Sequence, residues 1–351
     1  MITAGNADAP FPHNRGAGVN NVLSSPSIIN CILYRNSAQF GGGMLNGSLS
    51  SPIVTRCLFL ENVASERGGG VSNHFSGNPL LIECTMRGNR AQRGGALSNF
   101  FQTNAVMINC VFVGNSAEAN GGAVHSSQTD PTFINCMFSD NHAKGNGGAV
   151  YSLAGSNTSM INCTFKGNGA LAGGAIYTTD EFSGNLHSTA EVSNCIAHGN
   201  VPDQIASVSG ATTTVDFSNV EGGFIGDGNI DADPLFVDPE GDEANLRLLA
   251  GSPCIDAADN TAVPEGIVAD LDGNPRFVDD PDTDDTGFGK PPIVDMGAYE
   301  FQLQDPCECV NGRVTLCHIP PGNLANARTI TVGCAAGDRH LAHGDVCGPC
   351  E

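Results

Sequence analysis

Apolar and polar positions alternate in short runs around regularly spaced cysteines. In one run Ile108 lies two positions before Cys110, Phe112 lies two positions after it, and the polar Asn109 separates Ile108 from the cysteine. An alternation with a period of two predicts a half-buried strand rather than a helix. It also predicts that Ile108, Cys110 and Phe112 share one inner strand face. A Gly pair or triplet follows each of the first six runs, and a second short strand, such as residues 123–124, comes after it.

The run repeats along the chain with a nearly constant period. Successive cysteines are 26, 27, 26, 26, 27 and 32 residues apart, and each is followed five positions later by Asn. A period of 20–50 residues without a helical segment indicates a stacked array. We therefore predict an all-β fold, a right-handed parallel β-helix (β-solenoid) of about 26 residues per coil. The predicted structural ladders are Cys31, Cys57, Cys84, Cys110, Cys136, Cys163 and Cys195, and Asn36, Asn62, Asn89, Asn115, Asn141, Asn168 and Asn200.

These repeated residues have physical roles in a coil. A thiol is small and apolar, so we predict that the seven cysteines are buried free thiols of the core. A redox or metal array is the alternative, because stacked coils place neighbouring Cα atoms about 4.8 Å apart. We expect each ladder Asn to adopt the left-handed conformation at a corner and to pass amide hydrogen bonds between coils. The Gly pairs should supply positive φ where a Cβ would clash.

Two stretches resemble known families. Phe-x-x-Asn followed by Gly-Gly-Ala resembles the repeat of polymorphic outer membrane proteins of chlamydiae, with Leu33, Met86 and Ala197 as departures at the Phe position. That resemblance implies a β-helical surface adhesin. The strings at 229–238, 246–256, 270–276 and 294–301 are similar to the closing segment of secreted bacterial β-helix proteins of the choice-of-anchor Q type. The second resemblance implies secretion and attachment to a cell surface.

Acidic residues are concentrated in one part of the chain. Residues 201–306 hold 23 of the 37 Asp and Glu residues but three basic residues, and the whole chain carries a formal charge of −22. Such a charge excludes nucleic acid as a partner, and no apolar run long enough for a membrane span occurs. We predict β-helix coils over 1–220, an acidic closing segment of the β-helix over 221–305, and a small Cys- and His-rich module over 306–351. An extracellular or cell-surface location follows from the two resemblances.

Two segments contain candidate metal ligands. Asp270, Asp272 and Asn274 alternate around a Gly like the first half of a calcium loop, which predicts a calcium site. A plain turn is the alternative, in which Arg276 pairs with a buried acid such as Asp295. The acid run at 279–285 is predicted to be a solvated loop, with weak calcium binding as its alternative.

The tail concentrates cysteine and histidine. An even number of Cys in a short tail predicts three disulfides in an oxidising exterior. The alternative is a zinc or copper site built from Cys317 with His318, His340 and His343. The six predicted disulfide cysteines are Cys307, Cys309, Cys317, Cys334, Cys347 and Cys350.

The sequence predicts a secreted or cell-surface structural or adhesive solenoid that is not catalytic. Acids on the coils do not recur at one repeat position, which argues against a catalytic site. A carbohydrate-active lyase- or hydrolase-like β-helix is the alternative. The expected contacts are cell-surface polysaccharide or other copies of the chain, and no organic cofactor is expected. Because residues 1–19 look like part of a coil, we also expect an open axial face and head-to-tail association into a filament.

Overall fold

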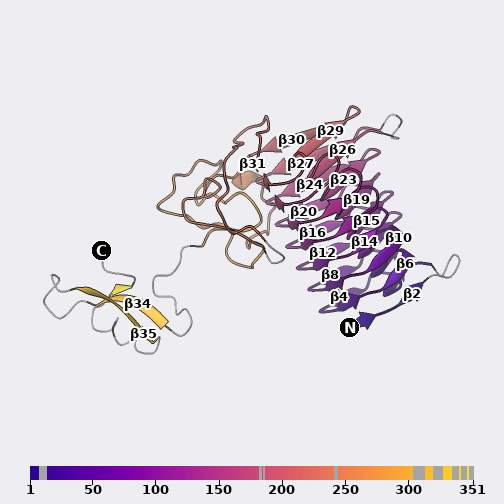
Figure 1. Ribbon diagram of the computed structural model, residues 1–351, viewed down its shortest axis with the longest axis horizontal. Coiled ribbons are helices and arrows are strands. Elements are labelled where there is room, and N and C mark those ends of the chain that lie inside the picture. The colour runs from indigo at the N-terminus through magenta and orange to yellow at the C-terminus, as the bar shows by residue number, and fades with distance from the viewer. Residues whose placement is uncertain are drawn as a thin grey trace. The chain divides into compact units, whose positions relative to one another are not determined.

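A computed structural model describes residues 1–7, 14–181, 184, 186–240, 244–302, 313–318, 327–333, 340 and 346–347. Contacts divide the chain into two units, Met1–Phe301 and Gln302–Glu351. The first unit is the predicted parallel β-solenoid, and the fold-class prediction is confirmed (Figure 1). Among the described residues, no helix is long and apolar enough to cross a membrane.

The coils contribute short strands to four parallel sheets, which we name A to D. Sheet A has nine strands and sheet B has six. The strands of sheet A are β1 (Ile2–Thr3), β5 (Ile32–Tyr34), β9 (Leu58–Leu60), β13 (Thr85–Arg87), β17 (Val111–Val113), β21 (Met137–Ser139), β25 (Thr164–Lys166), β28 (Ile196–His198) and β31 (Asn219–Val220). Those of sheet B are β2 (Asn6–Ala7), β6 (Ser37–Phe40), β10 (Val63–Arg67), β14 (Arg90–Ala91), β18 (Ser116–Ala117) and β22 (His142–Ala143).

Sheets C and D have eight strands each. Sheet C contains β3 (Val19–Val22), β7 (Met44–Gly47), β11 (Val71–His74), β15 (Leu97–Phe100), β19 (Val124–Ser127), β23 (Val150–Leu153), β26 (Ile176–Thr179) and β29 (Ile205–Val208). Sheet D contains β4 (Ser27–Ile29), β8 (Ile53–Thr55), β12 (Leu80–Ile82), β16 (Val106–Ile108), β20 (Thr132–Ile134), β24 (Asn157–Ile161), β27 (Thr189–Ser193) and β30 (Thr212–Asp216). The register repeats once per coil, so Phe112 pairs with Phe138 and Phe138 with Phe165.

Stacked identical side chains fill the interior. The rings of Phe112, Phe138 and Phe165 stack with centroids 4.7 and 4.8 Å apart and nearly parallel planes. This spacing is the distance between neighbouring strands, so the coil rise sets the ring contact. Together with the cysteines and the apolar residues of sheets C and D, the rings form one continuous core along the axis.

The prediction that the Ile two positions before each Cys faces inward is wrong. Asn109, which lies between Ile108 and Cys110, has a left-handed φ of 53°. At this residue the chain turns from sheet D into sheet A, which interrupts the alternation of faces. Met107 is therefore fully buried in the core, whereas Ile29, at the position equivalent to Ile108, is 51% exposed.

The Gly pairs are required at another corner. Gly121 has a φ of 70°, and a Cβ on the next residue, Gly122, would lie 2.2 Å from the carbonyl oxygen of Gly148 in the following coil. The first glycine therefore supplies the backbone conformation, and the second leaves room for close stacking of the coils.

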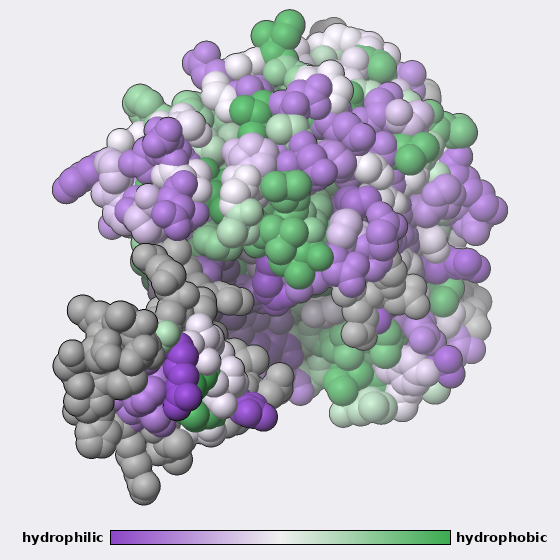
Figure 2. Space-filling view, turned by 60° about the vertical axis from the view of Figure 1, so that its left-hand side comes forward, coloured by the Kyte–Doolittle hydropathy of each residue, from purple (hydrophilic) through white to green (hydrophobic). Residues whose placement is uncertain are grey.

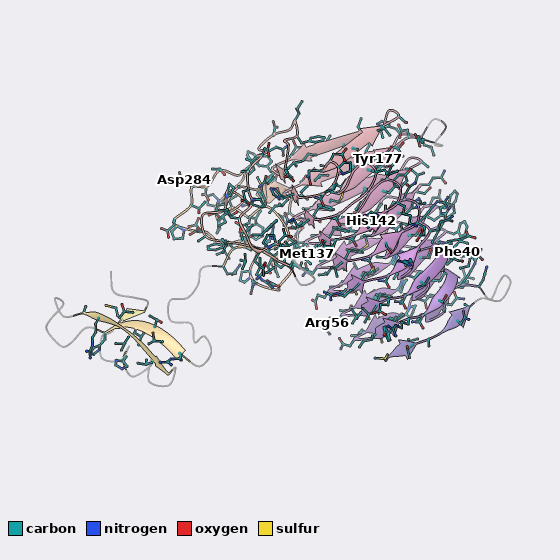
Figure 3. All side chains as sticks on the ribbon, viewed as in Figure 1. Phe40, Arg56, Met137, His142, Tyr177 and Asp284 are labelled. Atoms are coloured by element: carbon teal, nitrogen blue, oxygen red, sulfur yellow. The ribbon has the colours of Figure 1, made fainter. Side chains whose placement is uncertain are left out.

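The acidic closing segment folds back along the outer face of sheet A. It contains the antiparallel pair β32 (Phe236–Asp238) and β33 (Asn245–Leu248), and the 3-10 turn η1 (Asn260–Ala262). Ala298 N donates to Thr164 Oγ1 at 2.9 Å, and Tyr299 packs against Met137. Figure 3 labels Met137 beside the closing segment. A second apolar cluster, continuous with outward residues of β21 and β28, forms there. On the face shown in Figure 2, hydrophilic residues separate small hydrophobic groups.

The second unit contains a small antiparallel sheet. Its central strand is β34 (Arg313–His318), flanked by β35 (Arg328–Gly333) and β36 (Val346–Cys347). Leu316 is fully buried in this unit.

Candidate functional site

The Asn ladder runs inside the coils as a continuous chain of hydrogen bonds. The Nδ2 group of Asn115 donates to Asn141 Oδ1 at 2.9 Å and to the Met86 carbonyl at 2.8 Å, while its Oδ1 accepts from the backbone and side chain of Asn89. The expected left-handed conformation is wrong for these residues, because it falls on the preceding residue, such as Gly114. A ladder Asn thus joins three coils.

A second Asn ladder, in sheet C, was not predicted from the sequence. Asn21, Asn46, Asn73 and Asn99 are linked by Nδ2-to-Oδ1 hydrogen bonds of 2.8 Å at each step. Their recurrence every 25–27 residues was the available signal. Both ladders are buried, so they hold the coils in register and face no ligand.

The cysteine ladder also points inward. Cys57 to Cys195 are nearly inaccessible and free, and each of these thiols donates to the carbonyl two residues earlier, as Cys110 does to Ile108 at 3.4 Å. Burial raises the pKa of the Cys163 and Cys195 thiols well above the usual value, so thiolate chemistry is suppressed there. Cys31, in the first complete coil, is only half-buried, which departs from the prediction of seven buried thiols.

Acidic side chains on the coils form ion pairs between successive coils. Glu61 pairs with Arg35 at 2.7 Å, and Glu118 pairs with Lys144 at 2.5 Å. Arg35 and Glu61 also line a shallow groove beside Arg90, Gly88 and Gly114. A pair of carboxylates facing each other, which glycoside hydrolysis requires, is not among the residues lining this groove.

The outer face of sheet C and the adjoining ends of two sheet B strands, β6 and β10, carry an aromatic and arginine cluster. We define the aromatic–arginine face as Phe40, Arg67, His74, Phe75, Phe100 and Phe101. The guanidinium of Arg67 lies 4.2 Å from the Phe100 ring centroid, within range of a cation–π contact. Phe75 and Phe101 are 41% and 39% exposed, whereas Arg67 is half-buried beside them.

Aromatic residues continue this face toward later coils. His125, Tyr151 and Tyr177 stack with centroids 5.4 Å apart at both steps. Burial, followed by the charges of Arg67 and Arg93, lowers the pKa of His125 to about 3, so its ring is neutral. This stack was not predicted from the sequence, although each ring follows a Gly-Gly-Ala string by two positions.

The predicted calcium turn uses its oxygens internally. Asp270 Oδ1 accepts the N–H groups of Asp272 and Asn274, and its Oδ2 accepts the Glu300 N–H at 3.0 Å. Both carboxylate oxygens of Asp272 bind Arg247 at 2.6 Å. These hydrogen bonds occupy the oxygens that a calcium ion would need, which favours the alternative of a structural turn.

A buried cation lies beneath this turn. Arg276 is fully buried, donates to the backbone carbonyls of Asp295 and Gly297, and forms an ion pair with Glu300 at 3.5 Å. The predicted carboxylate partner was Asp295, and the ion pair instead involves Glu300. Burial raises the pKa of Asp295 to about 7, and burial followed by the Asp295 charge raises the pKa of Glu300. The single positive charge of Arg276 therefore cannot neutralise both buried carboxyl groups, Asp295 and Glu300.

The tail residues are only partly described. Cys317 is in a disulfide, and the rings of His318 and His340 lie 5.4 Å apart in an edge arrangement. Cys347 is described as part of β36. The remaining predicted tail ligands, Cys307, Cys309, Cys334, His343 and Cys350, lie outside the described residues.

The fold and its ladders define a class of protein, the repeat-built parallel β-solenoids. A family model for the Chlamydia polymorphic membrane protein (Chlamydia_PMP) repeat matches residues 109–127, 135–153 and 162–179. These matches cover consecutive coils and confirm the first resemblance, while the choice-of-anchor Q resemblance stays a prediction. No curated protein and no solved structure shows significant similarity to the chain.

Proposed function

We propose that this protein is a structural or adhesive β-solenoid of a bacterial cell surface and that its coils do not catalyse a reaction. The repeat match, to a family of surface proteins, carries the proposal. Support also comes from the cross-coil ion pairs, because acids engaged singly with basic residues of a neighbouring coil stabilise stacking. Secretion and attachment through the closing segment or the tail complete the proposal.

The aromatic–arginine face is the proposed contact surface, and its proposed ligand is a polysaccharide. Aromatic rings offer flat apolar surface to sugar rings, and Arg67 adds donors for hydroxyl or carboxylate groups. Residues 1–120 contain seven arginines against five acidic residues, so this part of an acidic protein does not repel an anionic glycan.

Binding of the whole chain to immobilised alginate and to cellulose tests this contact. Replacing exposed Phe75 and Phe101 together with Ala should abolish retention, whereas replacing Leu171, which is 73% exposed and lies outside the aromatic–arginine face, should not. If neither glycan retains the wild-type protein, the proposed contact is wrong. Appearance of new reducing ends or unsaturated products during the incubation would overturn the non-catalytic part of the proposal.

Self-association along the axis is a second proposed property. The positive balance of residues 1–120 and the large acidic excess of residues 201–306 make opposite parts of the first unit electrostatically complementary. Sedimentation at rising protein concentration should show larger species that dissociate as salt screens the charges. A strict monomer in low salt would refute axial association and leave the surface role standing.

A further inference from the structure

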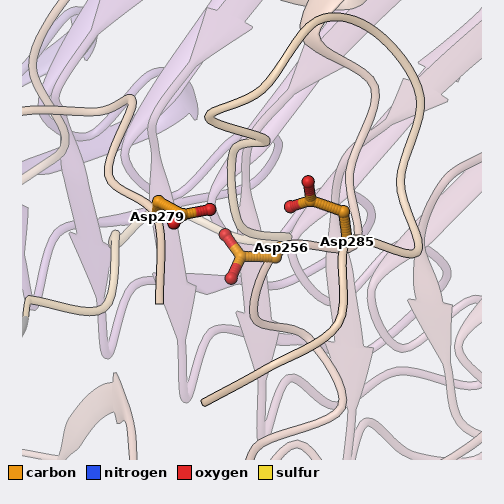
Figure 4. A group of neighbouring side chains, drawn as sticks. All are labelled: Asp256, Asp279 and Asp285. Carbon is orange, nitrogen blue, oxygen red and sulfur yellow. The ribbon is translucent and has the colours of Figure 1, made fainter. Parts of the chain in front are cut away.

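Three carboxylates of the closing segment converge from two separate parts of the chain. Asp256 lies in the turn after Cys254, whereas Asp279 and Asp285 lie on a loop further along. One oxygen from each of the three lies within 4.8 Å of the others. Figure 4 shows Asp279 and Asp285 on either side of Asp256, with their carboxylates directed toward it.

The Asp256 carboxylate is held in place but incompletely bonded. It is fully buried, its Oδ2 accepts the Asp280 N–H at 3.1 Å, and its Oδ1 is buried with no hydrogen-bond partner. Its backbone is bonded on both sides, because its N–H donates to Asp295 Oδ1 and its carbonyl accepts from Thr286 and Gly287. A buried carboxylate oxygen without a partner is costly, so a ligand at this oxygen would be favourable.

The loop is shaped to present the other two carboxylates. Asp280 turns inward, where its carboxylate accepts the Asp282 N–H and the Thr283 hydroxyl. Asp279 and Asp285, on either side of this turn, remain exposed. None of the ion pairs found among the described residues involves Asp256, Asp279 or Asp285. The three negative charges therefore face one another without a basic side chain between them.

We propose that Asp256, Asp279 and Asp285 bind a calcium ion. Calcium takes oxygen ligands at about 2.3–2.6 Å, so oxygens on opposite sides of one ion lie roughly 5 Å apart. The observed separations fit this geometry. An all-oxygen set with two exposed members suits a hard ion that keeps water ligands, rather than zinc or copper. The ion fastens the loop at 279–285 to the buried turn at Asp256, whose neighbours Ile255 and Ala257 pack in the second apolar cluster.

Calcium titration of the chelator-dialysed full chain, by calorimetry and by thermal melting, tests the site. We expect one calcium ion to bind at this site and to raise the melting temperature. Asp285→Asn should weaken that binding by roughly tenfold or more, whereas Asp284→Asn, an equal charge change at an exposed neighbour, should leave it intact. Asp272→Asn should also leave it intact, because Asp272 belongs to the predicted turn.

Replacing Asp256, the buried carboxylate of the site, should stabilise the calcium-free protein. Asp256→Asn removes the uncompensated charge, so the calcium-free protein should melt at a higher temperature and lose its response to calcium. The proposal is overturned if wild type shows neither heat nor a shifted melt. It is also overturned if Asp284→Asn weakens binding as much as Asp285→Asn, or if magnesium binds equally well, since both results indicate diffuse charge attraction.

Discussion

Replacing Asn115 with Ala tests whether the amide ladder holds the coils together. The substitution removes four side-chain hydrogen bonds, two donated by Nδ2 at 2.8 and 2.9 Å and two accepted by Oδ1 at 3.0 Å. The buried N–H of Asn89 is then left without its acceptor. A buried polar group that loses its partner costs about 1–3 kcal/mol, and a cavity adds to this. We expect a loss of about 4 kcal/mol in unfolding free energy.

Equilibrium urea unfolding, followed by far-UV circular dichroism, measures this loss. Asn115→Asp keeps the side-chain shape but cannot donate at neutral pH, so a similar loss would separate hydrogen bonding from cavity formation. The exposed Asn20 provides the control, and Asn20→Ala should change the free energy by no more than about 0.5 kcal/mol. A loss below about 1 kcal/mol for Asn115→Ala, or wild-type stability for Asn115→Asp, would refute the reasoning.

Three further predictions concern cysteine alkylation, the pH dependence of stability and the disulfides of the tail. Without denaturant, Cys31 should be alkylated first and Cys110 should stay protected, because Cys31 is half-buried and Cys110 is inaccessible; peptide mass mapping after labelling checks this order. Because burial raises the pKa of Glu300, the folded chain keeps a proton that the unfolded chain releases. Stability should therefore fall as pH rises above about 4, by up to about 1.4 kcal/mol per pH unit, and Glu300→Gln should flatten this slope in melts across pH. Intact mass before and after reduction should show three disulfides in the tail, and native mass retaining zinc or copper would support the metal alternative instead.

The repeating part of the fold could be predicted because the same local sequence pattern recurs in coil after coil. The period of about 26 residues, the short strands and the stacked aromatic core follow from patterns that recur in every coil. The direction of Ile108 could not be predicted from alternation, because one left-handed residue, Asn109, changes the phase between two strands. The rings of the aromatic–arginine face come from different positions in the coil, so no residue type recurring at one repeat position identifies them in the sequence.

The closing segment has no repeat, so its sequence determined little beyond composition and turn chemistry. Alternating acids at Asp270 and Asp272 predicted a calcium loop, yet backbone N–H groups and Arg247 bind those oxygens. Only the tertiary structure decided that Asp256 meets Asp279 and Asp285. Sequence by itself determined the coils, because each ladder residue interacts with its own equivalent one period away. The folding of the closing segment over sheet A brings Asp256, Asp279 and Asp285 together. Their proximity arises from packing between segments that share no periodicity, so the sequence pattern does not show it.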